Sequence, residues 1–345
     1  MNRALLAFGC GVFALMGAAL TGPAAAQDVG SFYRGKTLTM LVSNSAGGGY
    51  DLLPRPMGRH IARHLPGAPA AVVQNMPGAG GLVATNYLYS VAAQDGSVLA
   101  SLSNNVPFEP LFGTKDARFD PERLHWLGSP SVETGIVTIW HTSAVKTLDD
   151  ARKREITIPA NGANSTPSFY ARLLNETLGT KMRIILGYPG QNEMYTAMER
   201  GEVDGNSSVF YSSLVATRPR WLSEKQVNLL VQYGLDKSPD LGDTPFAPDL
   251  VTSEDDKLLM YAAFAPLAVG RPYAMPPGVP AERVKAMQEA FFAMFRDPEF
   301  IKDAERQKLD VSTPRSGAQL MEVIRKAYAM PEHIVARLRK LSAVE

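Results

Sequence analysis

Short apolar runs that end in glycine-rich or polar loops recur along the first third of this chain, and a helical pattern follows the first two. Thr37–Val42 is rich in strand-forming residues, and the run after it has helical spacing at Leu53, Met57, Ile61 and Leu65. This alternation is the strongest constraint on the fold. Strands that alternate with helices form an α/β sheet, and ligands bind such sheets at the carboxyl ends of the strands.

The loop Ser43–Asp51 follows the first of these strands. Its three consecutive glycines, Gly47–Gly49, let the backbone approach a ligand and turn N–H groups toward it, beside the partly positive start of a helix. Pro54 and Pro56 fit a helix only in its first turn, so we place the helix start near residue 53 and Asp51 in the loop. The loop is a candidate anion site, although glycine-rich loops of this kind also occur only to make tight turns.

Two further strands end in similar loops. Ala70–Gln74 leads to the glycine-rich segment Pro77–Gly81 and a helix over Leu82–Ala93, and Ser97–Leu102 ends close to Asn104 and Asn105. The glycines do not complete the G-x-G-x-x-G register, and no acidic residue follows at the distance that a dinucleotide site needs. We therefore expect no bound nucleotide cofactor.

Residues 1–26 have the pattern of a secretory signal. Arg3 precedes an uncharged apolar stretch from Ala4 to Leu20, and three alanines stand before Gln27. A membrane anchor is the alternative, but the stretch is short for a spanning helix. We predict cleavage after Ala26 and a periplasmic location.

The remaining chain contains no cysteine, because Cys10 lies in the predicted signal. With 45% hydrophobic residues over the full sequence it can build one or two domains without disulfides. Once Arg3 is removed, basic and acidic residues balance. This balance argues against nucleic acid or an anionic membrane as the partner.

A second α/β pattern begins after Leu124–Trp140, a mostly apolar segment that could leave one domain and enter another. Glu155–Pro159 reads as a strand, and the polar loop Asn161–Thr166 follows it. Thr166 precedes Pro167 and is predicted to cap the next helix. A strand over 182–186 and a helix over 191–200 continue the pattern.

Ala262–Gly270 is predicted to be a further strand, and helices follow it to the end of the chain. A chain that left the first domain near residue 133 and returned near residue 262 would place these helices back on that domain. We therefore predict one domain from residues 28–133 plus 262–345, and a second from residues 134–261.

Six short motifs, each weak alone, occur in an order and spacing that resemble the periplasmic solute-binding receptors of tripartite tricarboxylate transporters, also called Bug receptors. They are Ala46–Asp51, Asn75–Gly81, Ala93–Gly96, Gly187–Gly190, Gly201–Asp204 and Pro277–Val284. The resemblance covers nearly the whole chain after the signal. It implies a periplasmic-binding-protein (type II) Venus flytrap of two α/β domains, with the ligand cleft between them.

The resemblance further implies that the loops matching Ser43–Asp51 and Asn161–Thr166 hold a small carboxylate. Neither loop contains Arg or Lys, so an anion there would depend on N–H and hydroxyl donors. The candidate ligand-binding residues are Ser43, Asn44, Ser45, Gly47, Gly48, Gly49, Tyr50, Asp51, Asn104, Asn105, Asn161, Asn164, Ser165, Thr166, Tyr188 and Ser208.

Two positions depart from the pattern of these receptors. Ser43 and Asn44 replace a usual Pro-Phe pair, and Ser208 stands where many relatives carry an aspartate. That aspartate would suit an amine-bearing ligand, so its absence favours unaminated acids such as di- or tricarboxylates or aromatic acids. Ser165 is expected to have no capping role, and its replacement by alanine is predicted to weaken binding by about one to two decades.

A secreted hydrolase is the main alternative from another class. The chain has no G-x-S-x-G or H-E-x-x-H, and His60 and His64, beside Arg59 and Arg63, are predicted to be surface residues. We expect no catalytic residues, metal or cofactor. The expected partners are a small carboxylate and the membrane permease subunits of a transporter, with the receptor itself a monomer. A receptor of the same fold that serves a sensor kinase is equally compatible with the sequence.

Overall fold

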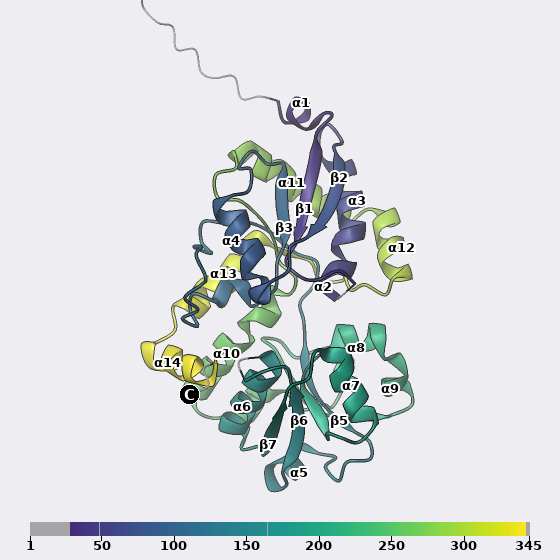
Figure 1. Ribbon diagram of the computed structural model, residues 1–345, viewed down its shortest axis with the longest axis vertical. Helices are drawn as coiled ribbons and strands as arrows, with labels where there is room; N and C mark the ends of the chain where they lie inside the picture. The colour runs from purple at the N-terminus through teal and green to yellow at the C-terminus, as the bar shows by residue number, and fades with distance from the viewer. Residues whose placement is uncertain (1–27, 48, 164, 343–345) are drawn as a thin grey trace, which may run out of the picture.

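The computed structural model describes residues 28–47, 49–163 and 165–342, and the predicted signal at 1–26 lies outside them. Figure 1 shows two lobes stacked along the long axis of the molecule. The first lobe, at the top, holds the strands from the beginning of the chain, and the second lobe, at the bottom, holds those from its middle. Each lobe has its own sheets and covering helices.

The first lobe is built on a six-stranded mixed sheet in the order β11-β4-β10-β3-β1-β2. Strand β1 pairs in parallel with β2 and β3, whereas β10 and β11 run antiparallel to their neighbours. The strands are β1 Thr37–Val42, β2 Ala70–Asn75, β3 Val98–Ser101, β4 His125–Ser129, β10 Tyr273–Met275 and β11 Arg315–Ser316.

Helices cover the two faces of this sheet. Helices α3 and α11 pack on each other around the buried side chains Met40, Met57 and Phe291, while α13 packs on β4 on the other face with Trp126 and Leu320. The helices of this lobe are α1 Val29–Tyr33, α2 Gly49–Leu52, α3 Pro54–His64, η1 Ala79–Gly81, α4 Leu82–Ser90, η2 Val106–Phe108, α11 Ala281–Met294, α12 Pro298–Arg306 and α13 Gly317–Tyr328.

The second lobe contains two smaller sheets, β8-β5-β9 and the parallel pair β6-β7. Its strands are β5 Gly135–Trp140, β6 Ile156–Ala160, β7 Met182–Leu186, β8 Gly205–Phe210 and β9 Val227–Tyr233. Its helices are α5 Leu148–Lys153, α6 Thr166–Leu178, α7 Gln191–Glu199, α8 Tyr211–Thr217, α9 Pro219–Ser223, η3 Pro239–Leu241 and η4 Ala247–Leu250.

Two late helices connect the lobes. The middle of α10, Glu254–Val269, belongs to the core of the second lobe from Leu259 to Phe264, whereas Ala265 and Ala268 near its end belong to a core of the first lobe. Helix α14, Glu332–Ser342, packs on α6 and α10, and Arg337 forms ion pairs of 2.7 Å with Glu176 and Asp256 there. The last described helix therefore packs on the second lobe, although α11–α13 pack on the first. The division at residues 133 and 262 remains a prediction.

The segment that joins β4 to β5 and the segment that follows α10 lie side by side. The buried Glu133 Oε1 pairs with Arg271 Nε at 2.9 Å, and Ser212 Oγ of α8 donates to the other oxygen of Glu133 at 2.6 Å. A Cβ atom on Gly270 would lie 2.0 Å from the Ser131 carbonyl oxygen, so only glycine fits this close approach. These contacts define the hinge between the lobes.

Two sequence predictions of local structure are wrong. Ala262–Gly270 is not a strand but the end of α10, which stops at Gly270. Nearly every residue of this stretch is buried, and a helix buried all round shows the same unbroken apolar run as a buried strand. Asp51 lies inside the short helix α2 rather than in the loop.

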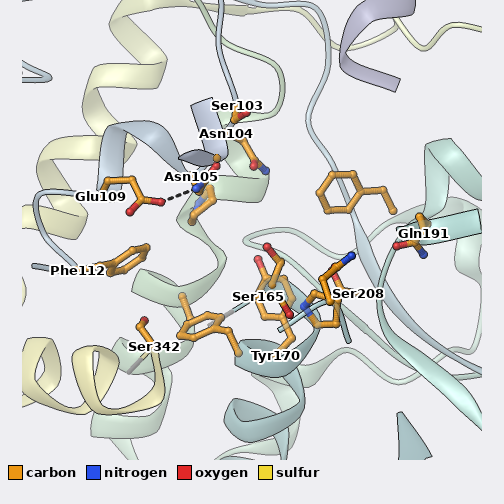
Figure 2. A pocket seen from close by; sticks show the side chains of 18 of the residues that line it. Ser103, Asn104, Asn105, Glu109, Phe112, Ser165, Tyr170, Gln191, Ser208 and Ser342 are labelled. Atoms are coloured by element: carbon orange, nitrogen blue, oxygen red, sulfur yellow. Dashed lines mark hydrogen bonds between the residues drawn. The ribbon is translucent and has the colours of Figure 1, made fainter. Parts of the chain in front are cut away.

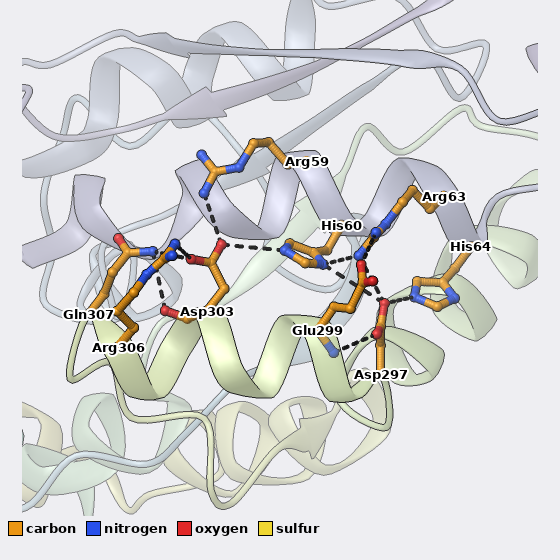
Figure 3. A network of polar contacts seen from close by, with 9 residues as sticks. All are labelled: Arg59, His60, Arg63, His64, Asp297, Glu299, Asp303, Arg306 and Gln307. Atoms are coloured by element: carbon orange, nitrogen blue, oxygen red, sulfur yellow. Dashed lines mark hydrogen bonds and ion pairs between the residues drawn. The ribbon is translucent and has the colours of Figure 1, made fainter.

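The contact between α3 and α12 corrects a third prediction (Figure 3). His60 is 8% exposed, and its Nε2 lies 3.4 Å from Asp303, which also accepts a bond from Arg59. His64 Nε2 lies 3.1 Å from Asp297. His60 is therefore a buried member of a charged helix-helix contact, not a surface residue.

Candidate ligand-binding site

A cavity of about 910 Å³ lies between the lobes, with walls from both (Figure 2). The first lobe contributes the segments after β1 and β3, and the second contributes the starts of α6 and α7 together with β8. Strands β1, β3 and β6 all direct their carboxyl ends to this cavity. The location agrees with the general rule for α/β sheets.

The segment after β1 presents an amide to the cavity. The Asn44 Oδ1 atom accepts bonds from Ser43 Oγ at 2.9 Å and from Ser103 Oγ at 3.0 Å. Because both hydroxyls occupy this oxygen, the Asn44 amide nitrogen remains as a donor at the cavity wall. Ser43 itself is buried beneath the wall.

Asp51 braces the same segment from inside. Its buried carboxylate accepts bonds from Gly47 N, Arg55 Nη2 and Asn75 Nδ2, each at 2.8 Å. Burial alone would raise the pKa of Asp51, but the bonds from Arg55, Gly47 and Asn75 outweigh it and hold the pKa below its usual value. The N–H of Gly47 therefore points to Asp51, and the carboxylate is not a cavity group.

Tyr50 offers a hydroxyl donor on this wall. Its Oη accepts a bond from the backbone N of Asn104 at 3.3 Å, and the Arg271 guanidinium lies 5.3 Å from its ring centre. Burial raises the pKa of Tyr50 to about 12, although Arg271 opposes the shift. The phenol therefore stays protonated at neutral pH, and its hydrogen is available to an acceptor in the cavity.

The opposite wall is the start of α6. Ser165 is the N-cap residue, and its hydroxyl donates to the Gly162 carbonyl at 2.7 Å, as does Ser168 Oγ at 2.8 Å. Thr166 is the first helical residue and lines the cavity with its exposed side chain. The N–H groups of a first helical turn have no partner within the helix, so Thr166 N–H is a donor at the positive end of α6.

The prediction that Thr166 caps α6 is thus wrong by one residue. Pro167 stands at the second helical position, where its missing N–H costs no more than at the first, so the Thr-Pro pair fits one step further into the helix. Ser165 stands at the N-cap position instead, but its hydroxyl makes no capping hydrogen bond, so the expectation that it has no capping role is confirmed.

A second helix start faces the same cavity. Gln191 begins α7 and lines the cavity together with Ser208 of β8. Asn161 Nδ2 donates to the carbonyl oxygens of Tyr188 and Pro189 at 3.0 and 3.1 Å, which ties the loop before α6 to the loop before α7. The polar end of the cavity is therefore surrounded by neutral donors and two helix N-termini.

Solved structures with the same fold are solute-binding proteins. A TctC solute-binding protein from Polaromonas superposes with a TM-score of 0.67 at 18% identity, over 90% of this chain and 98% of that one. The periplasmic binding protein BugD gives 0.62 at 16% identity, over 90% and 98%. MatC from Rhodopseudomonas palustris, with bound malate, gives 0.62 at 18% identity, over 89% and 99%.

The fold is that of the two-domain periplasmic binding proteins. The fold class predicted from the sequence is therefore confirmed. No protein-family model matches the chain, and no curated protein does so.

In this periplasmic-binding-protein fold, the cavity brings together half of the residues predicted to bind the ligand. Those that line it are Asn44, Tyr50, Asn104, Asn105, Asn161, Ser165, Thr166 and Ser208. The lining does not include Ser43, Ser45, Gly47, Asp51 or Tyr188. Gly49 is the first residue of α2. Gly48 and Asn164 lie outside the described residues. The assignment of all of them to a ligand remains a prediction.

Sequence reasoning missed several lining residues of the binding-protein cavity. Glu109, Phe112 and Thr114 follow η2, and Asn104-Asn105 just before them was the available signal. Phe169 reads in the sequence as part of the apolar face of α6, and Tyr170, next to it on that helix, was missed. Arg339 and Ser342 come from α14, and nothing local in the sequence indicates that this helix reaches the cavity.

Among residues 28–47, 49–163 and 165–342, no group of three or more His, Cys, Asp or Glu side chains is placed to hold a metal ion. Within the same residues, no helix is long and apolar enough to cross a membrane.

Proposed function

We propose that this chain is a periplasmic solute-binding receptor of the tripartite tricarboxylate transporter type, which captures a small carboxylate for uptake. One observation carries the proposal: the cavity between the lobes has neutral hydrogen-bond donors on both walls at its polar end. Asn44 and Tyr50 stand on one wall, and Thr166 at the start of α6 stands on the other.

An anion suits this arrangement for a physical reason. Helix N-termini and unpaired N–H and O–H groups stabilise negative charge without a cationic side chain. A ligand bonded to both walls would also stabilise the closed arrangement of the lobes, because only that arrangement provides both sets of donors. Closure is the signal by which such a receptor would present its cargo.

The ligand class follows from the motifs and is supported by one neighbour. MatC holds malate, which is a dicarboxylate. The sequence favours a di- or tricarboxylate or an aromatic acid, and the site as a whole supports the broader proposal of a small carboxylate for this chain. Export with removal of residues 1–26, a monomeric state and delivery to membrane permease subunits belong to the same proposal. A receptor of this kind binds its ligand without converting it.

A thermal-shift screen tests the function. The chain without residues 1–26 is melted with dicarboxylates, tricarboxylates, aromatic acids and amino acids, each in excess. A ligand present at about 100 times its Kd should add about 2.7 kcal/mol to the free energy of unfolding. Absence of any shift with every carboxylate would refute the function, and steady consumption of the bound acid by the pure protein would refute the absence of turnover.

A further inference from the structure

The far side of the cavity carries a carboxylate that the proposed function does not use. Glu109 is partly buried and lines the cavity. Its Oε1 accepts a bond from Asn105 Nδ2 and its Oε2 accepts one from Thr114 Oγ1, both at 2.5 Å. Both donors are neutral, and no ion pair of Glu109 is found within the described part of the chain. The carboxylate is thus held in place while its charge remains uncompensated.

The cation that also lines the cavity is already engaged. Arg339 Nε donates to the Leu111 carbonyl at 3.2 Å, and its Nη1 lies 3.4 Å from Glu332. The Arg339 side chain is 46% exposed, so solvent screens its charge as well. Glu109 and Arg339 bring opposite charges to the described lining of the cavity, but only Arg339 has an ionic partner, so Glu109 is the charge that an oppositely charged ligand group can still pair with.

Glu109 lies across the cavity from the start of α7, and Ser165 at the start of α6 lies between them. Figure 2 shows Glu109 and Phe112 on one side of the cavity, and Gln191 and Ser208 on the other. The rings of Phe112 and Phe169, one from each lobe, approach with centroids 6.3 Å apart beside Glu109. A ligand that reached from the helix starts to Glu109 would pass these rings and would need an apolar middle.

We propose that the ligand is a carboxylate whose opposite end carries a protonated amine, and that Glu109 binds this amine. The assignment of a carboxylate to the other end of the ligand rests on the proposed function. A partly buried charge with only neutral partners gains most from an opposite charge, whereas a second carboxylate would be repelled by it. Glu109 thus outweighs the expectation of an unaminated acid that Ser208 suggested.

Calorimetric titration with four acids of equal length tests this proposal: 6-aminohexanoate, 6-hydroxyhexanoate, hexanoate and adipate, followed by shorter and longer sets. The amino acid should bind at least about tenfold more tightly than the other three in its set. In Glu109→Gln this preference should disappear, adipate should gain affinity, and hexanoate should change by less than about threefold.

A second variant and a matched control keep the test sharp. Glu109→Asp keeps the negative charge but places it on a shorter side chain, further from the bound ligand. The preference for an amine should therefore persist, and the amino acid that binds most tightly should be a longer one. Glu289→Gln removes an exposed carboxylate on α11, outside the cavity lining, and should leave all affinities unchanged. Each variant is first melted to confirm that it is folded.

Three results separate the possibilities. If plain or hydroxy acids bind as tightly as the amino acid, Glu109 does not select an amine and the proposal fails while the receptor function stands. If adipate binds most tightly and Arg339→Gln abolishes its binding, the far end selects an anion and the proposal also fails. If no acid of any set binds, the amine proposal fails, and the thermal-shift screen with its tricarboxylates and aromatic acids decides the proposed function.

Discussion

The two walls of the cavity hold their loops in opposite ways. In the first lobe the brace is a carboxylate: Asp51 accepts from the Gly47 N–H, so this N–H is turned away from the cavity. In the second lobe the brace consists of donors: Ser165 and Ser168 bond the Gly162 carbonyl, and Arg172 Nη1 bonds the Ala163 carbonyl at 2.9 Å.

This difference assigns different donors to each wall. Where carbonyl oxygens are engaged from behind, N–H groups face the ligand, as at the start of α6. Where an N–H is engaged, the donors must come from side chains, and Asn44 and Tyr50 supply them on the first wall. Gly47 in the first loop thus directs its N–H to Asp51, and we expect any backbone donors to an anion to lie on the second wall.

Breaking the carboxylate brace should have the largest effect. In Asp51→Asn the bonds from Arg55 and Gly47 lose their charged acceptor, and we expect the free energy of unfolding to fall by about 2–3 kcal/mol. Affinity for the best acid should fall as well, because Asn44 loses its support. Urea unfolding measures the first effect and calorimetry the second. The exposed Asp116→Asn should change neither by more than about 0.5 kcal/mol.

Removing the donor of the first wall should be next in size. Tyr50→Phe deletes the hydroxyl, and one hydrogen bond to a charged group corresponds to about 1.5–3 kcal/mol, or a loss of affinity of roughly 10- to 100-fold. Calorimetry on folded protein measures it, with the exposed Tyr87→Phe as the control. Unchanged affinity would show that the first wall does not bond the anion through Tyr50.

The second wall should depend less on its serine than the sequence suggested. The Ser165 hydroxyl is engaged with Gly162, so Ser165→Ala should weaken binding by less than about threefold. Thr166→Val, which removes a hydroxyl at the cavity and keeps the shape, should weaken it by about tenfold. The reverse order, measured by titration of both variants, would mean that the ligand displaces the Ser165 bond.

The smallest expected effect is a pH dependence of the free energy of unfolding, which arises from the contact between α3 and α12 in the first lobe. Burial alone would raise the pKa of Asp303, but bonds from Arg59, Gln307, Arg306 and His60 outweigh it and lower the pKa to about 2. Because the pKa of Asp303 is lowered in the folded state, its contribution to the free energy of unfolding is complete above the ordinary value of about 3.9. This contribution is lost as the pH falls toward about 2.

The variant Asp303→Asn should therefore lose stability at neutral pH, and its difference from the wild type should shrink as the pH falls through this window. Equilibrium unfolding at a series of pH values measures it, with Asp116→Asn as the control. A difference that grows on acidification would contradict the sign.

How far the sequence could lead is clear from these same elements. Helical spacing places α3 and α7 correctly, since one face of each is buried and the other is not, and short apolar runs place β1 and β7. The end of α10 cannot be predicted in this way, because a helix that is buried on every side shows no helical period in its apolar residues. For the candidate site, loops that follow strands were visible, whereas Glu109 and Arg339 reach the cavity only through tertiary packing.

Helix α14 has a mechanical consequence for the whole molecule. The hinge near Glu133 and Arg271 supplies two links between the lobes, and the turn from α13 to α14 supplies a third, with Met330 packed against the cores of both lobes. Two adjacent links alone would let the lobes both bend and twist relative to one another. A third link set apart from them restricts the twist. We therefore expect the lobes to part on the side away from these links, and a ligand to enter there.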